Sequence, residues 1–255
     1  MGNGYTNRYN TASIYNELRW AAGDPFPESG FAEAEPGRFY DLHSHPVVGA
    51  RDHAEVSRLR KELTSHFSKV YEADVITITL GLIEAWFDRE NETYINFAPV
   101  FVAPQALGQR LQASRFEFRV MSFEENMRYL ESIYSLLEVH NPNAIIFVTV
   151  SPVNLMATFS TRDVVVANCF SKAMLRTCAE SWKQMHPERI QYFPSYEMAT
   201  LSNRELVYQG DGLHIRPDFV QQIMRYFKEV ALASDSGTTL ERGSRTPAAG
   251  TSASR

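Results

Sequence analysis

Two runs of β-branched and other apolar residues, at 74–80 and 144–150, limit most strongly what this chain can fold into. After Asp74, every position in both runs is apolar or a β-branched threonine, which is typical of strands that helices cover on both faces of a parallel sheet. A shorter run at 190–193 predicts a third strand. Because parallel neighbours need a crossover connection, these runs also predict helices between the strands.

Between the apolar runs, apolar residues recur at the spacing of α-helices. Ser122 and Glu125 form a capping box, which predicts that a helix begins there, and Asn141-Pro142 marks its end. The sequence also predicts helices at residues 11–22, 53–71, 161–185 and 217–231, and leaves open a break near Asn168 in the third of these. Alternating strands and helices predict an α/β protein of the flavodoxin type, a three-layer α/β/α sandwich with a parallel sheet.

Two further segments of the chain differ from the rest in amino-acid composition. Residues 23–50 hold four prolines and four glycines, which predicts a long irregular excursion of the kind that compact domains keep for function. The segment 234–255 lacks aromatic residues and has Leu240 as its one large aliphatic residue, so we expect a disordered tail. The expected organisation is therefore one α/β domain over residues 1–233 followed by this tail.

Charge and cysteine content narrow the expected partners. The formal net charge is −5, the sequence pI is about 5.8, and the basic residues are scattered, so neither nucleic acid nor an anionic membrane is expected to bind. Cys169 and Cys178 lie in one predicted helix, where they cannot form a disulfide, which fits a reducing compartment. Without a visible signal peptide or membrane-spanning run, we expect a cytoplasmic protein. The oligomeric state cannot be predicted from these residues.

A candidate catalytic pair stands in the loop before the last predicted helix, where Asp211-Gly212-Leu213-His214 places a carboxylate three residues before a histidine. Such a carboxylate can fix the tautomer of the imidazole and stabilise the imidazolium that forms when the histidine takes a proton. Ligands of parallel sheets bind beyond the carboxyl ends of the strands. We therefore expect this loop to lie near Gly81 and Ser151, which follow the first two strands. An ordinary turn with a surface histidine is the alternative.

Several sequence blocks occur in a recognisable order. Residues 79–86 read TLGLIEAW, and Asp211–His214 comes last; the blocks at 4–11, 149–153, 166–176 and 192–197 complete the set. In this order they resemble the GSCFA-domain proteins, a branch of the SGNH/GDSL hydrolase superfamily. The Gly-Ser-Cys-Phe-Ala block, which holds the family's nucleophilic serine, is not in the printed chain. Ile83 stands where the superfamily's oxyanion asparagine is expected.

The resemblance implies an SGNH-hydrolase-like fold and an ester hydrolase or acyltransferase that acts on an acylated carbohydrate or a similar small ester, without a cofactor. In that chemistry a serine attacks the ester carbonyl, a histidine removes the serine proton, and N–H groups hold the oxyanion. The resemblance makes His214 the general base and Asp211 the residue that orients it.

Four further residues are candidates for the oxyanion hole or for substrate binding. Gly81 would supply an oxyanion N–H and Asn7 an amide, with a strand-ending glycine and a turn asparagine as the alternatives. Glu84 would line the site, with an exposed acid at a helix start as the alternative. Ser151 is expected to line the site too but to be a poor substitute nucleophile, because a hydroxyl in this position usually bonds to the local backbone.

Two other functions remain open. Because the printed chain lacks the nucleophile block, it is expected to hydrolyse esters weakly or not at all, and a version extended upstream is expected to be more active. The chain would be a non-catalytic remnant that binds a ligand or partner if that block is truly lost. Alternatively, Asp41, His43 and His45 would hold the metal of a hydrolase, because histidines at i and i+2 of a strand share one face. The surrounding prolines and glycines, with no apolar strand before them, argue against this metal site.

Overall fold

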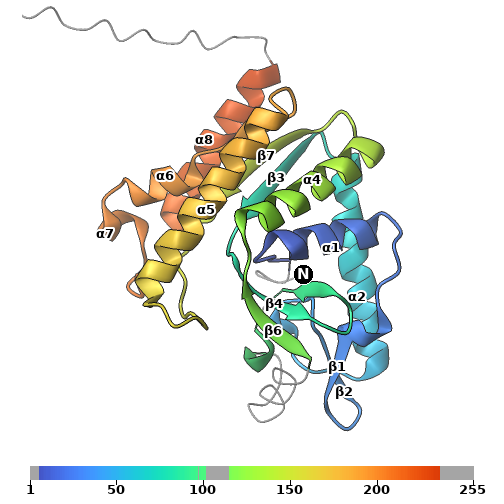
Figure 1. The fold of residues 1–255 in the computed structure, drawn as a ribbon. Coiled ribbons are helices and arrows are strands. Elements are labelled where there is room, and N and C mark those ends of the chain that lie inside the picture. The colour runs from blue at the N-terminus through green and yellow to red at the C-terminus, as the bar shows by residue number, and fades with distance from the viewer. Residues whose placement is uncertain (1–5, 97, 102–114, 236–255) are drawn as a thin grey trace, which may run out of the picture. The chain divides into compact units, whose positions relative to one another are not determined.

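The computed structural model describes residues 6–96, 98–101 and 115–235, drawn in colour in Figure 1. The chain divides into two compact units, Met1–Arg216 and Pro217–Arg255. The second unit contains the helix α8 (Pro217–Asp235), which begins at a proline whose fixed φ suits the first helical position. Phe219, Ile223 and Phe227 recur along α8 at helical spacing, which makes it amphipathic.

A parallel sheet in the first unit confirms the three predicted strands. It consists of β3 (Val75–Leu80), β7 (Ile145–Val150) and β8 (Ile190–Tyr192), in the order β3-β7-β8. Val75 pairs with Ile145, and the register continues without a shift to the ends of both strands. The sheet and its flanking helices make a mixed α/β fold that is compatible with an α/β/α sandwich.

The crossover helices of this sheet are α4 (Phe123–His140) and α5 (Val164–Met185), and they pack against each other. The predicted capping box of α4 is present in both directions between Ser122 and Glu125. Helix α1 (Thr11–Ala21) lies beside α4, as Figure 1 shows. Together these helices bury the strands' even-numbered side chains in the main core, which includes Leu80, Leu130, Val148, Leu175 and Trp182.

The other face of the sheet is covered unevenly. At β7, the short helix α6 (Ser195–Thr200) packs on this face, and the hydroxyls of Thr149 and Ser195 lie 2.6 Å apart. At β3, burial alternates along the strand, and Val75 is 42% exposed. The prediction that helices cover both faces of residues 74–80 is therefore wrong for this strand. Its two threonines tolerate water, so the run alternates more than its β-branched character suggests.

An antiparallel sheet that the sequence did not predict follows β3. It consists of β4 (Glu84–Asp88), β5 (Thr93–Ile95) and β6 (Phe116–Val120), in the order β5-β4-β6. Side chains of this sheet and of the neighbouring hairpin form a second core cluster around Trp86 and Phe116.

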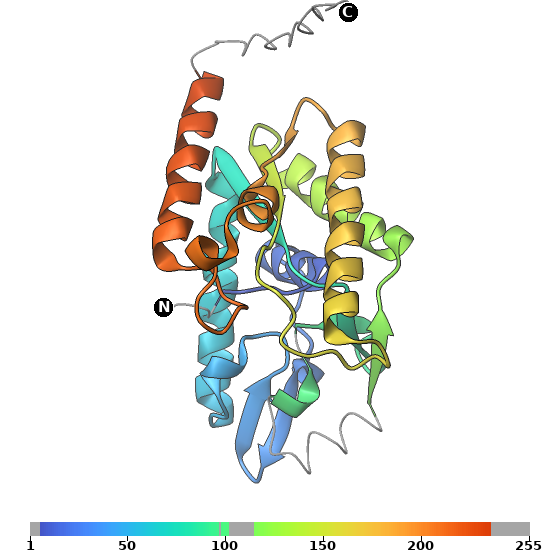
Figure 2. The same cartoon turned by 90° about the vertical axis from the view of Figure 1, so that its left-hand side faces the viewer.

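Residues 23–50 are more regular than predicted. They contain the antiparallel hairpin β1 (Phe31–Glu35) and β2 (Arg38–Asp41), which projects beside α2 (His53–Phe67) in Figure 2. Gly37 has a φ of +73°, a conformation that glycine allows at a tight turn. The expectation of one irregular excursion was therefore wrong for the hairpin, because β1 alternates small and acidic residues after Phe31 and β2 has only four residues, so neither strand carries a clear hydrophobic signal.

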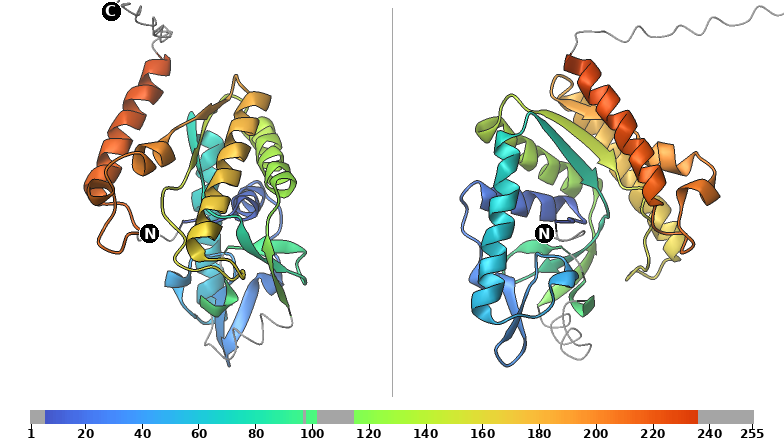
Figure 3. Two further views of the ribbon diagram at one scale, coloured as in Figure 1. Left: turned by 60° about the vertical axis from the view of Figure 1, so that its left-hand side comes forward. Right: turned by 180° about the vertical axis from the view of Figure 1, so that it is seen from behind.

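The remaining elements are short or confirm predictions. The helix predicted at 53–71 is α2 followed by a 3-10 turn, Ser68–Glu72, and the helix at 161–185 begins at Val164 behind the cap Asp163, without a break at Asn168. Further elements are α7 (Arg204–Val207) and the 3-10 turns Glu28–Gly30, Pro46–Val48 and Pro99–Phe101. Figure 3 shows these connections from two further sides. Within the described ranges, no helix is long and apolar enough to cross a membrane. Of the tail predicted at 234–255, residues 234–235 are the end of α8, and residues 236–255 lie outside the described ranges.

Candidate active site

A cavity of about 510 Å³ lies beyond the carboxyl ends of β3 and β7. Gly81 follows β3 and Ser151 follows β7, and both line the cavity together with Glu84 and His214. The other lining residues come from the antiparallel sheet, the segment after β7, helix α5 and the N-terminal segment: Tyr9, Pro46, Leu82, Ala85, Trp86, Asn96, Ala98, Phe118, Val153–Ala157, Phe159, Lys172 and Leu213. The structure thus brings together residues that lie more than 130 positions apart, at the sheet edge where ligands of parallel sheets bind.

The loop that carries His214 is shaped by a tight turn. The N–H of Gly212 donates to the carbonyl of Gln209 at 2.9 Å, and Gly212 has a φ of +67°. The Oδ1 atom of Asp211 then accepts from the N–H groups of Leu213 at 2.9 Å and of His214 at 3.0 Å. Asp211 therefore fixes the backbone of the histidine as well as its ring.

The side chains of Asp211 and His214 form a direct hydrogen bond, in which Nδ1 of the histidine donates to Oδ2 of the aspartate at 2.6 Å. This bond is the largest of the effects that lower the pKa of Asp211 to about 2. The carboxylate is therefore ionised at neutral pH and keeps the ring proton on Nδ1. The other ring nitrogen, Nε2, has no hydrogen-bond partner in the part of the chain that the structure describes, so it is free to exchange a proton.

Gly81 lies where two backbone segments touch. A Cβ atom at this position would stand 2.6 Å from the carbonyl oxygen of Tyr9, which also accepts from the N–H of Leu82 at 2.7 Å. A side chain therefore does not fit here. The N–H of Gly81 makes no hydrogen bond with the described residues, so it can still donate to a ligand.

Ser151 is held by local contacts. Its N–H continues the sheet by donating to the carbonyl of Leu80 at 2.8 Å, and its Oγ accepts from the N–H of Val153 at 3.3 Å. The hydroxyl thus lines the cavity but serves the backbone after β7, as expected for a residue in this position.

Glu84 lines the cavity from the first position of β4, not from a helix start. Its Oε1 accepts from the hydroxyl of Thr158 at 2.5 Å, and its Oε2 accepts from the N–H of Phe159 at 3.4 Å. Glu84 therefore holds the segment between β7 and α5 against the antiparallel sheet.

Asn7 is not among the described residues that line the cavity. Its carbonyl oxygen accepts from Nδ2 of Asn96 at 3.0 Å, and the side chain of Asn96, not that of Asn7, reaches the cavity. The geometry therefore gives no support to an oxyanion role for the Asn7 amide.

Lys172 lines the cavity; it belongs to the sequence block 166–176 but was not among the candidate site residues. It is 1% exposed, and its Nζ atom donates to the carbonyl oxygen of Gly81 at 2.9 Å. Burial lowers the pKa of Lys172 from 10.5 to about 8, because the charged form loses its hydration. A signal was present in the sequence: Lys172 stands three and seven residues before Leu175 and Ala179, on the buried stripe of α5.

Three aromatic rings form one wall of the cavity. The ring of Trp86 lies 5.5 Å from that of Phe118 and 5.2 Å from that of Phe159, measured between centroids. These residues come from β4, β6 and the segment after β7, so their convergence depends on the tertiary fold. The wall makes the cavity predominantly apolar, with His214 and Lys172 as its cationic or proton-donating groups.

The rival metal-binding residues do not converge on a common point. Oδ2 of Asp41 accepts from Nη1 of Arg60 at 3.3 Å, while the His43 ring packs edge-on to Trp20 with centroids 4.8 Å apart. Nε2 of His45 bonds to the hydroxyl of Tyr9 at 3.0 Å. Within the described ranges, no group of three histidine, cysteine, aspartate or glutamate residues could hold a metal ion.

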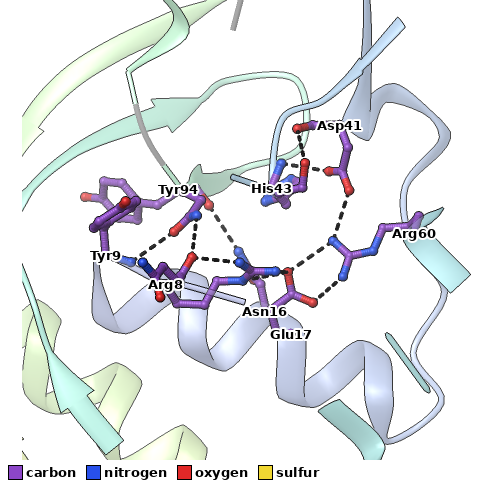
Figure 4. A network of polar contacts seen from close by, with 11 residues as sticks. Arg8, Tyr9, Asn16, Glu17, Asp41, His43, Arg60 and Tyr94 are labelled. Atoms are coloured by element: carbon purple, nitrogen blue, oxygen red, sulfur yellow. Dashed lines mark hydrogen bonds and ion pairs between the residues drawn. The ribbon is translucent and has the colours of Figure 1, made fainter. Parts of the chain in front are cut away.

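Asp41 belongs instead to a buried ionic network, shown in Figure 4. The Glu17 carboxylate accepts from Nε of Arg8 at 2.9 Å and from Nη1 of Arg60 at 3.1 Å, and Arg60 bridges it to Asp41. Burial and the nearby arginines, Arg60 foremost, lower the pKa of His43 well below its usual range, so the ring is neutral. The network ties α1, α2 and β2 together.

Residues 1–227 match the family model described as the GSCFA family. No curated protein matches the chain.

Proposed function

Because the chain belongs to the GSCFA family, we propose that it is an SGNH-like ester hydrolase or acyltransferase, acting on an acylated carbohydrate or a similar small ester. The observation that carries this proposal is the bond between Asp211 and His214 at a cavity that Gly81 also lines. An oriented imidazole and a free backbone N–H that line one cavity are two of the groups that acyl transfer requires, and an attacking hydroxyl is the third.

The chemistry assigned to these residues follows from their contacts. Asp211 keeps the proton of His214 on Nδ1, so Nε2 can take a proton from an attacking hydroxyl and return it to the leaving alcohol. The N–H of Gly81 would donate to the oxygen that becomes negative as the carbonyl is attacked. The aromatic wall around Trp86 would bind the apolar part of the ester.

Hydrolysis of p-nitrophenyl acetate by wild type and by the His214→Ala variant tests the assignment. We expect the variant to lose roughly 10²- to 10⁴-fold in turnover, the usual contribution of general-base catalysis. Asp211→Asn should also lose turnover, because the amide no longer enforces the productive tautomer.

His186→Ala is the matched control. Nε2 of His186 bonds to Glu131 at 2.9 Å, so it is also a histidine paired with a carboxylate, but it stacks on Tyr134 and is not a lining residue of the cavity. Its turnover should equal that of wild type. Equal turnover by wild type and His214→Ala would contradict the proposed role of His214.

A second candidate function is ligand or partner binding without catalysis. It is favoured by the local bonding of Ser151, whose Oγ accepts from the N–H of Val153 and donates to no described atom of His214. If the chain binds ligands in the cavity but His214 variants show no loss in any ester assay, this candidate is preferred.

A further inference from the structure

Lys172 is a buried amine whose hydrogen bonds are incomplete. An ammonium group has three donors, and Nζ of Lys172 is bonded to one acceptor among the described residues, the carbonyl oxygen of Gly81. No carboxylate of the described residues forms an ion pair with it. Burial alone accounts for the shift of its pKa, which is the signature of a cation without a counter-charge.

A buried cation without a counter-charge is unfavourable, because its lost hydration is not replaced. A neutral donor such as glutamine could satisfy the Gly81 carbonyl at a smaller cost. The presence of an amine instead therefore points to a ligand that pairs with it. Lys172 lines the cavity, and such a ligand would approach it from there. An anion placed there would supply both the missing acceptor and the missing charge.

The rest of the cavity restricts which anion fits. Trp86, Phe118 and Phe159 form an apolar wall, so a small hydrated anion would leave most of the space unfilled. Glu84 contributes a negative charge at the cavity, but Thr158 and Phe159 already donate to both of its oxygens. A ligand with one anionic end and an apolar body matches these features.

We infer that the cavity binds carboxylates with an apolar body, and that Lys172 recognises the carboxylate while the aromatic wall holds the body. The role of this carboxylate site in the reaction rests on the proposed function. If the chain hydrolyses esters, the acyl half of the substrate is an apolar carboxylic acid, and the carboxylate of the product lies against Lys172. Lys172 is here a residue that determines specificity.

The matched ligands phenylacetate and phenylacetamide test the inference, because they differ in charge and hardly in shape. Affinities are measured by ligand-observed NMR titration at pH 7. Wild type should prefer phenylacetate about tenfold, since a charge-assisted hydrogen bond exceeds a neutral one by roughly 1.4 kcal/mol, a tenfold change. In Lys172→Gln, which keeps a donor for Gly81, and in Lys172→Met, the preference should fall to about one.

Circular dichroism and thermal melts establish whether both variants fold. Whether or not they fold, the wild-type preference is also measured from pH 7 to pH 10, and it should decline as Lys172 loses its proton. Tyr9, Glu84 and His214 also line the cavity, and a folded Lys172 variant retains all three and so reports their share of any pH dependence.

Equal affinity of wild type for the two ligands, no binding of either, or a preference that persists without the lysine would each overturn the inference. A wild-type preference that is constant with pH would also overturn it. Binding is measured here without turnover, so a chain that shows no His214-dependent hydrolysis can still confirm the carboxylate site. Conversely, a chain that hydrolyses esters without this preference contradicts the carboxylate site alone.

Discussion

Two regions of the molecule bury a cationic side chain, and they differ in whether a carboxylate balances its charge. In the ionic network, Arg60 is 3% exposed and contacts the carboxylates of Glu17 and Asp41, so its charge is balanced within the protein. At the cavity, Lys172 is equally buried but contacts a carbonyl oxygen. The first arrangement is complete without a ligand, whereas the second leaves charge and donors unused at the surface of a cavity.

This difference distinguishes polar groups that stabilise the fold from polar groups that are available to a ligand. Paired charges between α1, α2 and β2 fix the relative positions of these elements, and they leave no group free for chemistry. At the cavity, Nε2 of His214, the N–H of Gly81 and Nζ of Lys172 each keep hydrogen-bonding capacity that no described residue uses. The sequence favoured Asp211 and His214 over a metal site at Asp41, His43 and His45, and the contacts of these residues support the same preference.

Removal of one partner from the network should have the largest effect. Glu17→Gln leaves Arg8 and Arg60 with one carboxylate between them, so we expect a loss of about 3–5 kcal/mol in the free energy of unfolding. Urea denaturation measures it. Glu62→Gln, which breaks the exposed pair with Arg58, is the control and should change stability by less than about 1 kcal/mol. Similar losses in both variants would mean that burial of the network contributes little.

Lys172 should show the opposite behaviour, a buried charge that destabilises the fold. Burial lowers the pKa of Lys172 from its ordinary 10.5 to about 8 in the folded chain, so between these values the unfolded chain binds the proton more strongly. The stability of wild type relative to Lys172→Met should therefore rise with pH from about 8 to 10.5, by about 3 kcal/mol in total. Urea unfolding of both proteins at pH 7 and pH 10 measures this difference, and tyrosine titration largely cancels between them. A constant difference would show that Lys172 is not held as an uncompensated cation.

Gly81→Ala tests the close approach at the cavity rather than its charge. The added Cβ would stand 2.6 Å from the Tyr9 carbonyl oxygen, so the backbone must shift, at a cost of about 1–3 kcal/mol. Phenylacetate binding should weaken as well, because the Gly81 carbonyl positions Lys172. Gly210→Ala is the control, since its Cβ would meet no atom within 4 Å. Wild-type stability and binding in Gly81→Ala would contradict the tight contact.

The parts of the fold that sequence predicted are those with local signals. The capping box of Ser122 and Glu125 and the apolar run of β7 each identify an element without reference to the rest of the chain. The sheet of β4, β5 and β6 was missed because β4 pairs with a strand that begins at Phe116, beyond any local pattern. A hydrophobic run cannot show which distant strand will complete a sheet.

The candidate site also has some parts that the sequence could predict and others that it could not. The bond between Asp211 and His214 spans three residues and could be anticipated, as could the position of Gly81 at a strand end. The aromatic wall could not, because Phe118 and Phe159 meet only in the folded chain. Lys172 stood on an apolar helix stripe, and a lysine in that position is itself a signal of either a paired or a functional amine.

Thr158→Val should have the smallest effect on stability and should reveal how the cavity wall is held. The hydroxyl of Thr158 donates to Glu84, whose other oxygen accepts a longer bond from Phe159, so the variant should lose about 1 kcal/mol. Thr177→Val is the control, because Thr177 bonds to the carbonyl of its own helix at an exposed position and should change stability by less than about 0.5 kcal/mol. Since Phe159 follows Thr158 directly, phenylacetate and phenylacetamide should both bind more weakly to the Thr158 variant, by the same factor. A loss confined to phenylacetate would instead mean that the wall positions the carboxylate, and the division between the apolar wall and the lysine would have to be abandoned.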